Sequence, residues 1–150
     1  MLALTLHRPW SWAIFRAGKA VENRRWPLPP ALLGKTVALH AGRQFSRDTF
    51  WAMTNGEFGA AARAVPAGES EHPHGIIGLV RFTTCVRANR YLMSPLEAAL
   101  QPWFFGPFGW VIGWSVELRE AIPCRGRQRF WKVPKRIEAE IREQVPGVAA

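Results

Sequence analysis

The chain has 150 residues, of which 48% are hydrophobic, and its 20 Lys and Arg against 11 Asp and Glu give a formal net charge of +9. This length supports one compact domain with its own core and is short for two, so we expect a single domain over residues 1–150. No run approaches the ~20 apolar residues of a membrane span, and the first residues lack a signal-peptide pattern, so we expect a cytoplasmic protein without a membrane partner.

The N-terminal part predicts a strand, a helix and a second strand. Apolar residues alternate with others over 2–7, as in a strand with one buried face. Pro9 fits the first position of a helix, and residues 10–17 carry apolar side chains at helical spacing. Gly18 fits the end of that helix, because glycine adopts positive φ freely. Residues 20–24 then form a short extended run.

The middle of the chain predicts a loop, a strand and helical pieces. The proline-rich segment 26–30 cannot be regular structure. A strand is expected over 36–41, followed by a helix with Ser46 as its N-cap. A second helical piece is expected over 57–64. Residues 65–75 are rich in Pro, Gly, Ser, Glu and His and predict an exposed loop.

The second half predicts several short strands. The expected elements are strands over 76–86, 109–118, 122–124 and 128–133, a short helix capped by Ser94, and a terminal helix over 134–144. Most strands lie too close together in the sequence for helical crossovers. We therefore expect the α+β class, as a small mixed or antiparallel β-barrel with helices packed around it.

Positive charge gathers near the C-terminus and predicts a nucleic-acid surface. Seven cations face a single acid between residues 119 and 136, and Phe130 and Trp131 lie among them. Basic side chains interleaved with aromatic rings are typical of surfaces that bind phosphates and stack bases. The residues expected at the nucleic-acid backbone are Arg125, Arg127, Arg129 and Lys132. A basic surface that serves solubility alone is the other interpretation.

The segment after the first helix crowds Lys19, Glu22 and Arg24 into six positions among apolar neighbours. In an extended run Glu22 and Arg24 face the same way. A buried lysine must be paired or lose its proton, and a desolvated lysine can serve as a base or nucleophile. These residues are candidates for ligand binding and, in an enzyme, Lys19 and Glu22 are the catalytic candidates. An ion-pair network that only fixes the corner is the alternative.

Further ligand-binding candidates are Trp10, which can stack on a base, and His40 and Arg43, which flank a glycine where a backbone can approach a ligand. A core role for Trp10 or His40 is the competing interpretation. Cys85 and Cys124 lie far apart without Cys or His clustering, so neither a metal site nor a disulfide is predicted. No nucleotide-binding or hydrolase fingerprint is present, and no cofactor is expected.

The chain resembles the ASCH domain family of the PUA-like superfamily. The resemblance rests on four blocks in order: His7 to Trp12; Gly18 to Arg24; Leu39 to Gly42; and Trp103 to Val111 with Pro123 to Gly126 and Phe130 to Pro134. The family's GxKxxExR motif falls on Ala17, Lys19, Glu22 and Arg24, with Ala17 replacing its first glycine. The resemblance implies a PUA-like barrel and a cleft that binds RNA, DNA or a nucleotide-like ligand.

Some small ASCH proteins hydrolyse N4-acylated cytidine with the motif lysine, a threonine and a second glutamate. This chain has Glu22 at the position of that threonine, so the same catalytic arrangement is not copied here. Ribonuclease activity is also associated with the family. We therefore expect an RNA-directed nucleic-acid or modified-nucleotide binding domain with a basic cleft. The alternatives are a hydrolase acting on a modified nucleobase, a ribonuclease, or a scaffold whose basic flank docks an acidic protein.

Overall fold

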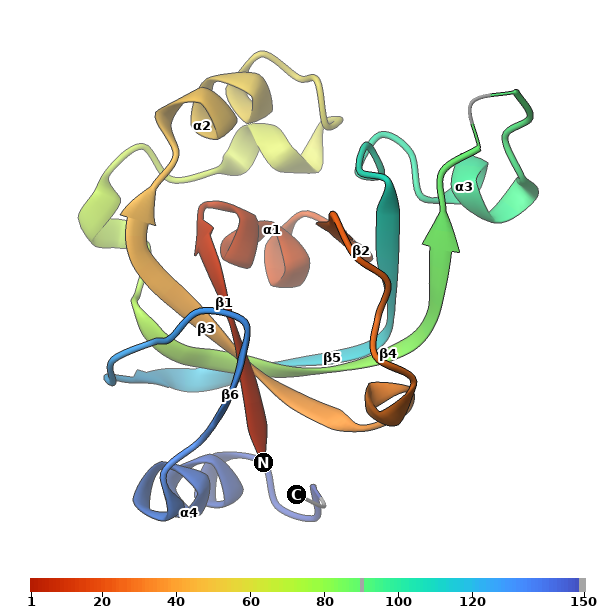
Figure 1. Cartoon of the computed structure of the whole chain (residues 1–150). Helices are drawn as coiled ribbons and strands as arrows, with labels where there is room; N and C mark the ends of the chain where they lie inside the picture. Colours follow the sequence, from red (N-terminus) through yellow and green to blue (C-terminus); the bar gives the residue numbers. More distant parts are fainter. Residues whose placement is uncertain (90, 149–150) are drawn as a thin grey trace.

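The computed structural model describes residues 1–89 and 91–148 and contains one six-stranded sheet that curls into a half-barrel (Figure 1). The strands are β1 (Leu2–Arg8), β2 (Val21–Arg24), β3 (Thr36–Phe45), β4 (Gly75–Arg87), β5 (Phe108–Ile122) and β6 (Phe130–Lys132). The helices are α1 (Trp10–Arg16), α2 (Arg47–Thr54), α3 (Pro95–Ala99) and α4 (Lys135–Gln144), with 3₁₀ turns η1 (Pro30–Leu32), η2 (Ala61–Ala64) and η3 (Glu69–Glu71). The predicted α+β class is confirmed.

The strand order is β2-β5-β4-β3-β1-β6, so β2 and β6 are the two edges of the sheet. Strands β1 and β3 pair in parallel, and every other pair along this order is antiparallel. The predicted mixed sheet is therefore present as a barrel that stays open between its two edge strands. That opening positions the site described below.

The alternation of β1 divides its side chains between two faces of the sheet. Leu4 and Leu6 are buried in an apolar cluster with Ile14 of α1, which lies inside the curve of the sheet (Figure 1). Thr5 and His7 occupy the alternate positions and therefore point to the opposite face. On that face α4 packs through an apolar cluster that includes Ile137 and Ile141, while the segment 123–129 crosses near Thr5.

Several local signals have the predicted effect. Gly18 has a φ of +73° at the end of α1. The Ser46 hydroxyl accepts a hydrogen bond from the Thr49 amide at the start of α2. Ser94 and Glu97 form a capping box at α3. In each case the residue satisfies or avoids an unpaired backbone group at a helix end.

Three predicted elements are wrong in detail. Residues 57–64 form turns and the 3₁₀ turn η2 instead of a continuous helical piece. The strand expected over 122–124 does not form, because Ile122 ends β5 and Pro123 has no N–H to continue the ladder. The loop 65–75 is not uniformly exposed, since His72 is buried and its Nε2 lies 2.9 Å from the Pro66 carbonyl oxygen.

The helices in the described part of the chain are short, and none has the length and apolar character required to cross a membrane.

Candidate nucleic-acid interface

The corner between α1 and β2 is held by a row of three charges. The Lys19 ammonium donates to the Val21 carbonyl at 2.5 Å and to Glu22 Oε2 at 3.0 Å. The other carboxylate oxygen, Glu22 Oε1, lies 3.1 Å from Arg24 Nε. One carboxylate thus serves two cations, and the extended backbone of β2 places Glu22 and Arg24 on the same face as the sequence predicts.

Lys19 is almost completely enclosed at this corner. Its exposed fraction is 2%, and its Nζ lies 5.6 Å from the centre of the Trp10 ring. Trp10 itself packs against Phe58 and Phe105, with ring centroids 5.3 and 5.5 Å away. Of the two outcomes that burial allows for a lysine, pairing is the one observed. The Lys19 ammonium is therefore occupied by protein groups.

Arg24 has one end anchored and one end free. Its guanidinium carbon lies 5.6 Å from the centre of the Trp26 ring and 5.5 Å from that of Trp110, within the range of cation–π attraction. The terminal guanidinium nitrogens make no hydrogen bond with the residues that the structure describes. The planar group is thus held in place by Glu22 and two rings, with its terminal donors available to an anion.

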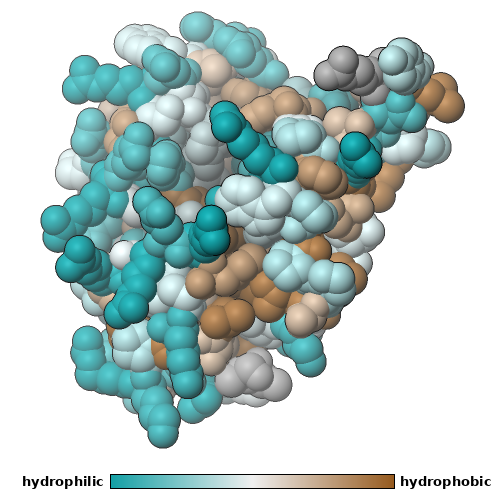
Figure 2. Space-filling view, in the orientation of Figure 1, coloured by the Kyte–Doolittle hydropathy of each residue, from teal (hydrophilic) through white to brown (hydrophobic). Residues whose placement is uncertain are grey.

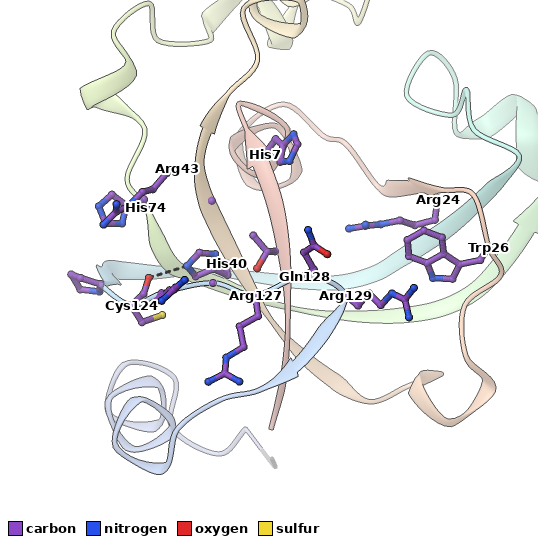
Figure 3. A pocket seen from close by; sticks show the side chains of 15 residues that line it. His7, Arg24, Trp26, His40, Arg43, His74, Cys124, Arg127, Gln128 and Arg129 are labelled. Carbon is purple, nitrogen blue, oxygen red and sulfur yellow. Dashed lines mark hydrogen bonds between the residues drawn. The ribbon is translucent and has the colours of Figure 1, made fainter.

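The Arg24 side chain lines a large cleft between the end of β2 and the segment 123–129 (Figure 3). The cleft has a volume of about 1380 Å³. Its lining residues are Thr5, His7, Arg24, Trp26, His40, Gly42, Arg43, His74, Pro123, Cys124, Arg125, Gly126, Arg127, Gln128 and Arg129. In Figure 3 Arg24, Trp26 and Arg129 lie at one end of the cleft, and His40, Arg43 and His74 lie at the other. Strands that are distant in sequence therefore contribute to one site.

The lining is strongly cationic. It contains five arginines and three histidines, and no Asp or Glu among the described residues lines it. Within residues 1–89 and 91–148, four of these arginine side chains make neither a hydrogen bond nor an ion pair: Arg43, Arg125, Arg127 and Arg129. Figure 2 shows hydrophilic side chains gathered over the segment between β5 and β6 and over α4. Clustered cations of this kind concentrate polyanions.

His40 forms part of the cleft floor and supports the segment that crosses it. Its Nε2 lies 3.1 Å from the Cys124 carbonyl oxygen, so the neutral ring donates there. A Cβ on Gly126 would lie 2.5 Å from His40 Nδ1, so only glycine allows this close approach. Burial lowers the pKa of His40 below its ordinary value, and the nearby charge of His74 lowers this pKa further. The ring is therefore neutral at pH 7.

Six of the ten residues proposed from the sequence line this single cleft: Arg24, His40, Arg43, Arg125, Arg127 and Arg129. The other four are Trp10, Lys19, Glu22 and Lys132, none of which lines it. Lys19 and Glu22 contribute indirectly, since Glu22 anchors Arg24. The roles of all ten residues stay predictions.

Nine of the fifteen lining residues were not among those proposed from the sequence, and Trp26 and Gln128 are two of these nine. Trp26 is 42% exposed and follows Arg24 by two positions, at the start of the proline-rich loop. An aromatic ring in a loop beside a charged motif is a usable signal, because loops carry binding residues. Gln128 lies between Arg127 and Arg129, and an amide within a basic run is a weaker signal.

Comparison with known proteins gives similarity at the level of structure. No protein-family model matches the chain, and no curated protein matches it in sequence. The crystal structure of ASCH from Zymomonas mobilis is similar over 95% of this chain and 93% of its own, with 16% identity and a TM-score of 0.49. A mutant form of an ASCH protein from Zymomonas mobilis is similar over 95% of this chain and 96% of its own, with 14% identity and a TM-score of 0.48.

Proposed function

We propose that this protein binds single-stranded nucleic acid, with RNA preferred over DNA, in the cleft between β2 and the segment 123–129. The observation that carries the proposal is the gathering of five arginines in one cleft whose described lining has no carboxylate. Arginine binds phosphate through two parallel hydrogen bonds, and several such contacts along one groove suit a phosphate backbone. The four arginines without protein partners have their donors available for this purpose.

The exposed ring of Trp26 favours single-stranded over double-stranded nucleic acid as the ligand. Its ring is 42% exposed and is backed by Arg24 and Trp110. Unstacked bases of a single strand can lie on such a ring, a contact of roughly 1–3 kcal/mol per base, whereas bases inside a duplex cannot reach it. Trp26 therefore takes the stacking role that the sequence suggested for Trp10, which lies among other rings.

The size of the cleft favours a strand over a modified mononucleotide. Pockets for small molecules usually have volumes of roughly 300–1000 Å³. The cleft, at about 1380 Å³, exceeds that range. The modified-nucleotide alternative remains compatible with one end of the cleft, where Arg24 and Trp26 lie together.

Binding is also favoured over the hydrolase and ribonuclease alternatives. A lysine that acts as base or nucleophile must reach the reacting atoms. Lys19 is 2% exposed, and its ammonium contacts Val21, Glu22 and Trp10 instead of the cleft.

Mass spectrometry of pooled RNA and of N4-acylcytidine after incubation with the protein tests catalysis directly. Products that form with the wild type and are absent with Lys19→Ala would favour an enzyme.

The proposal is tested by fluorescence anisotropy with a labelled single-stranded RNA. Removal of one phosphate contact by Arg127→Ala should lower affinity about fivefold at 0.1 M salt. The matched control is Arg87→Ala, which removes the same charge at the end of β4, where the guanidinium lies 5.9 Å from the Phe108 ring and outside the cleft. Equal losses in both variants would contradict a site in the cleft. Equal competition by polyglutamate and unlabelled RNA would favour an acidic protein partner.

A further inference from the structure

An exposed aromatic ring lies beyond the cleft, on the loop that precedes β5. Phe105 is 60% exposed and does not line the cleft. Its ring packs on that of Trp10 with centroids 5.5 Å apart, and the centroid of the Phe58 ring lies 6.2 Å away. The ring is therefore supported and oriented from within the protein, while much of its surface faces solvent and can accept a ligand.

The backbone that carries Phe105 is fixed to β2 by one side chain. The carboxamide oxygen of Asn23 accepts hydrogen bonds from the Phe105 amide at 3.0 Å and from the Gly106 amide at 2.9 Å. The carboxamide nitrogen of Asn23 donates to the Trp103 carbonyl oxygen at 2.9 Å. Because both ends of this carboxamide have partners, its orientation is settled. A ring on a fixed turn loses little entropy on binding.

The edge strand β2 connects this ring to the cleft. Strand β2 pairs with the start of β5 (Figure 1). Trp26, the exposed ring that lines the cleft, follows Asn23 by three residues, which span at most ~11 Å. Since Phe105 is hydrogen-bonded to Asn23, the backbones of the two exposed rings lie within ~20 Å of each other. A stacked strand advances ~3.4 Å per nucleotide, so about six nucleotides cover this distance.

A cation without a protein partner follows β2 directly, on the stretch of chain that leads from Asn23 to Trp26. Arg25 is exposed and does not line the cleft. Within residues 1–89 and 91–148 its guanidinium makes neither a hydrogen bond nor an ion pair. Aromatic rings that accept bases, combined with cations that bind phosphates, are the recurring parts of single-strand sites. Continuity with the cleft favours the same strand over a separate protein partner as the occupant of this surface.

We propose that Phe105 is a second base-stacking platform, on which a single strand that leaves the cleft at Trp26 continues past Arg25. This inference rests on the proposed function, because the cleft must first hold the strand. It makes the binding site longer than the cleft. A strand that ends within the cleft contacts the cleft arginines and Trp26, and a longer strand adds a base on Phe105 and a phosphate on Arg25.

The test is fluorescence anisotropy with labelled oligouridines of about 4 and about 12 nucleotides, both within the range of single-strand sites. Phe105→Ala should lower the affinity for the longer strand about fivefold or more, the lower end for one stacked base, and leave the shorter strand unaffected. Phe105→Trp keeps an aromatic face and should bind as the wild type does. Phe105→Leu keeps apolar bulk without that face, so it should lose affinity as the alanine variant does.

Arg25→Ala tests the phosphate contact separately from the stacked base. It should weaken the binding of the longer strand alone. Because one phosphate contact is lost, it should also reduce the magnitude of the slope of log affinity against log salt concentration for that strand by about 0.7. Phe105→Ala removes no charge and should leave this slope unchanged.

The matched control is Trp51→Ala, which removes a ring on α2 that is also 60% exposed. This variant should bind both strands as the wild type does. Equal effects of Phe105→Ala and Trp51→Ala, an equal loss for both strand lengths, or wild-type affinity in Phe105→Leu would overturn the stacking platform and leave the proposed function standing. A wild type that binds neither strand would overturn the proposed function and this inference together.

Discussion

Arg129 occupies a backbone conformation that normally belongs to glycine. The substitution Arg129→Gly therefore tests two separate effects: the cost of this conformation to folding stability and the contribution of the arginine side chain to RNA binding. The left-handed conformation, with a φ of +59°, costs a residue with a Cβ roughly 1–2 kcal/mol. Glycine avoids this cost, although its greater freedom in the unfolded chain removes roughly 0.4–1 kcal/mol of the gain. We therefore expect Arg129→Gly to raise the free energy of unfolding by about 0.5–1 kcal/mol.

The same substitution should weaken RNA binding. Arg129 lines the cleft and has no ion-pair partner in the described part of the chain, so its loss removes one phosphate contact. For a single strand this lowers affinity about fivefold at 0.1 M salt. A variant that folds more stably and binds less tightly is the expected combination.

Urea denaturation measures the stability change, and anisotropy with a labelled RNA measures binding. Arg129→Ala is the matched control, because alanine keeps the Cβ and its conformational cost while losing the charge. It should therefore lose affinity to the same degree without the gain in stability. A less stable Arg129→Gly variant would contradict the conformational reasoning, and unchanged RNA affinity would contradict a binding role for Arg129.

Two further substitutions test the corner and the cleft floor. Glu22→Ala leaves the Lys19 ammonium buried without its carboxylate and should lower the free energy of unfolding by about 3 kcal/mol in urea denaturation. Adding Lys19→Met should recover part of this loss, and a Glu22→Ala variant as stable as the wild type would rule out the buried pair. The lowered pKa of His40 means that the unfolded chain takes up a proton before the folded protein does. The free energy of unfolding should thus fall as the pH decreases below about 6.5. The substitution His40→Gln should reduce this pH dependence. Identical pH profiles of the wild type and the His40→Gln variant would contradict this role of His40.

The elements that could be predicted from the sequence are those set by local chemistry. Gly18 ends α1 because of its positive φ, and Ser46 and Ser94 cap helices through hydrogen bonds to nearby amides. The side-by-side placement of Glu22 and Arg24 follows from the period of a strand. These features need no knowledge of distant parts of the chain.

The shape of the candidate site depends on contacts between distant segments. The parallel pairing of β1 with β3 and the crossing of the segment 123–129 over His40 bring Arg43 and Arg129 to one cleft. Local patterns do not specify such pairing. Burial likewise decides that Lys19 faces the interior with Trp10 while Trp26 faces the cleft, although all three lie close to the same motif.

The salt dependence of RNA binding tests the arginine cleft most directly. Five arginines that each neutralise one phosphate of a single strand give a slope of about −3.5 in a plot of log affinity against log salt concentration. Replacing Arg125, Arg127 and Arg129 together by alanine should reduce the magnitude of this slope by about 2. A slope near zero for the wild type, or one that the triple substitution leaves unchanged, would show that these arginines do not bind the phosphate backbone.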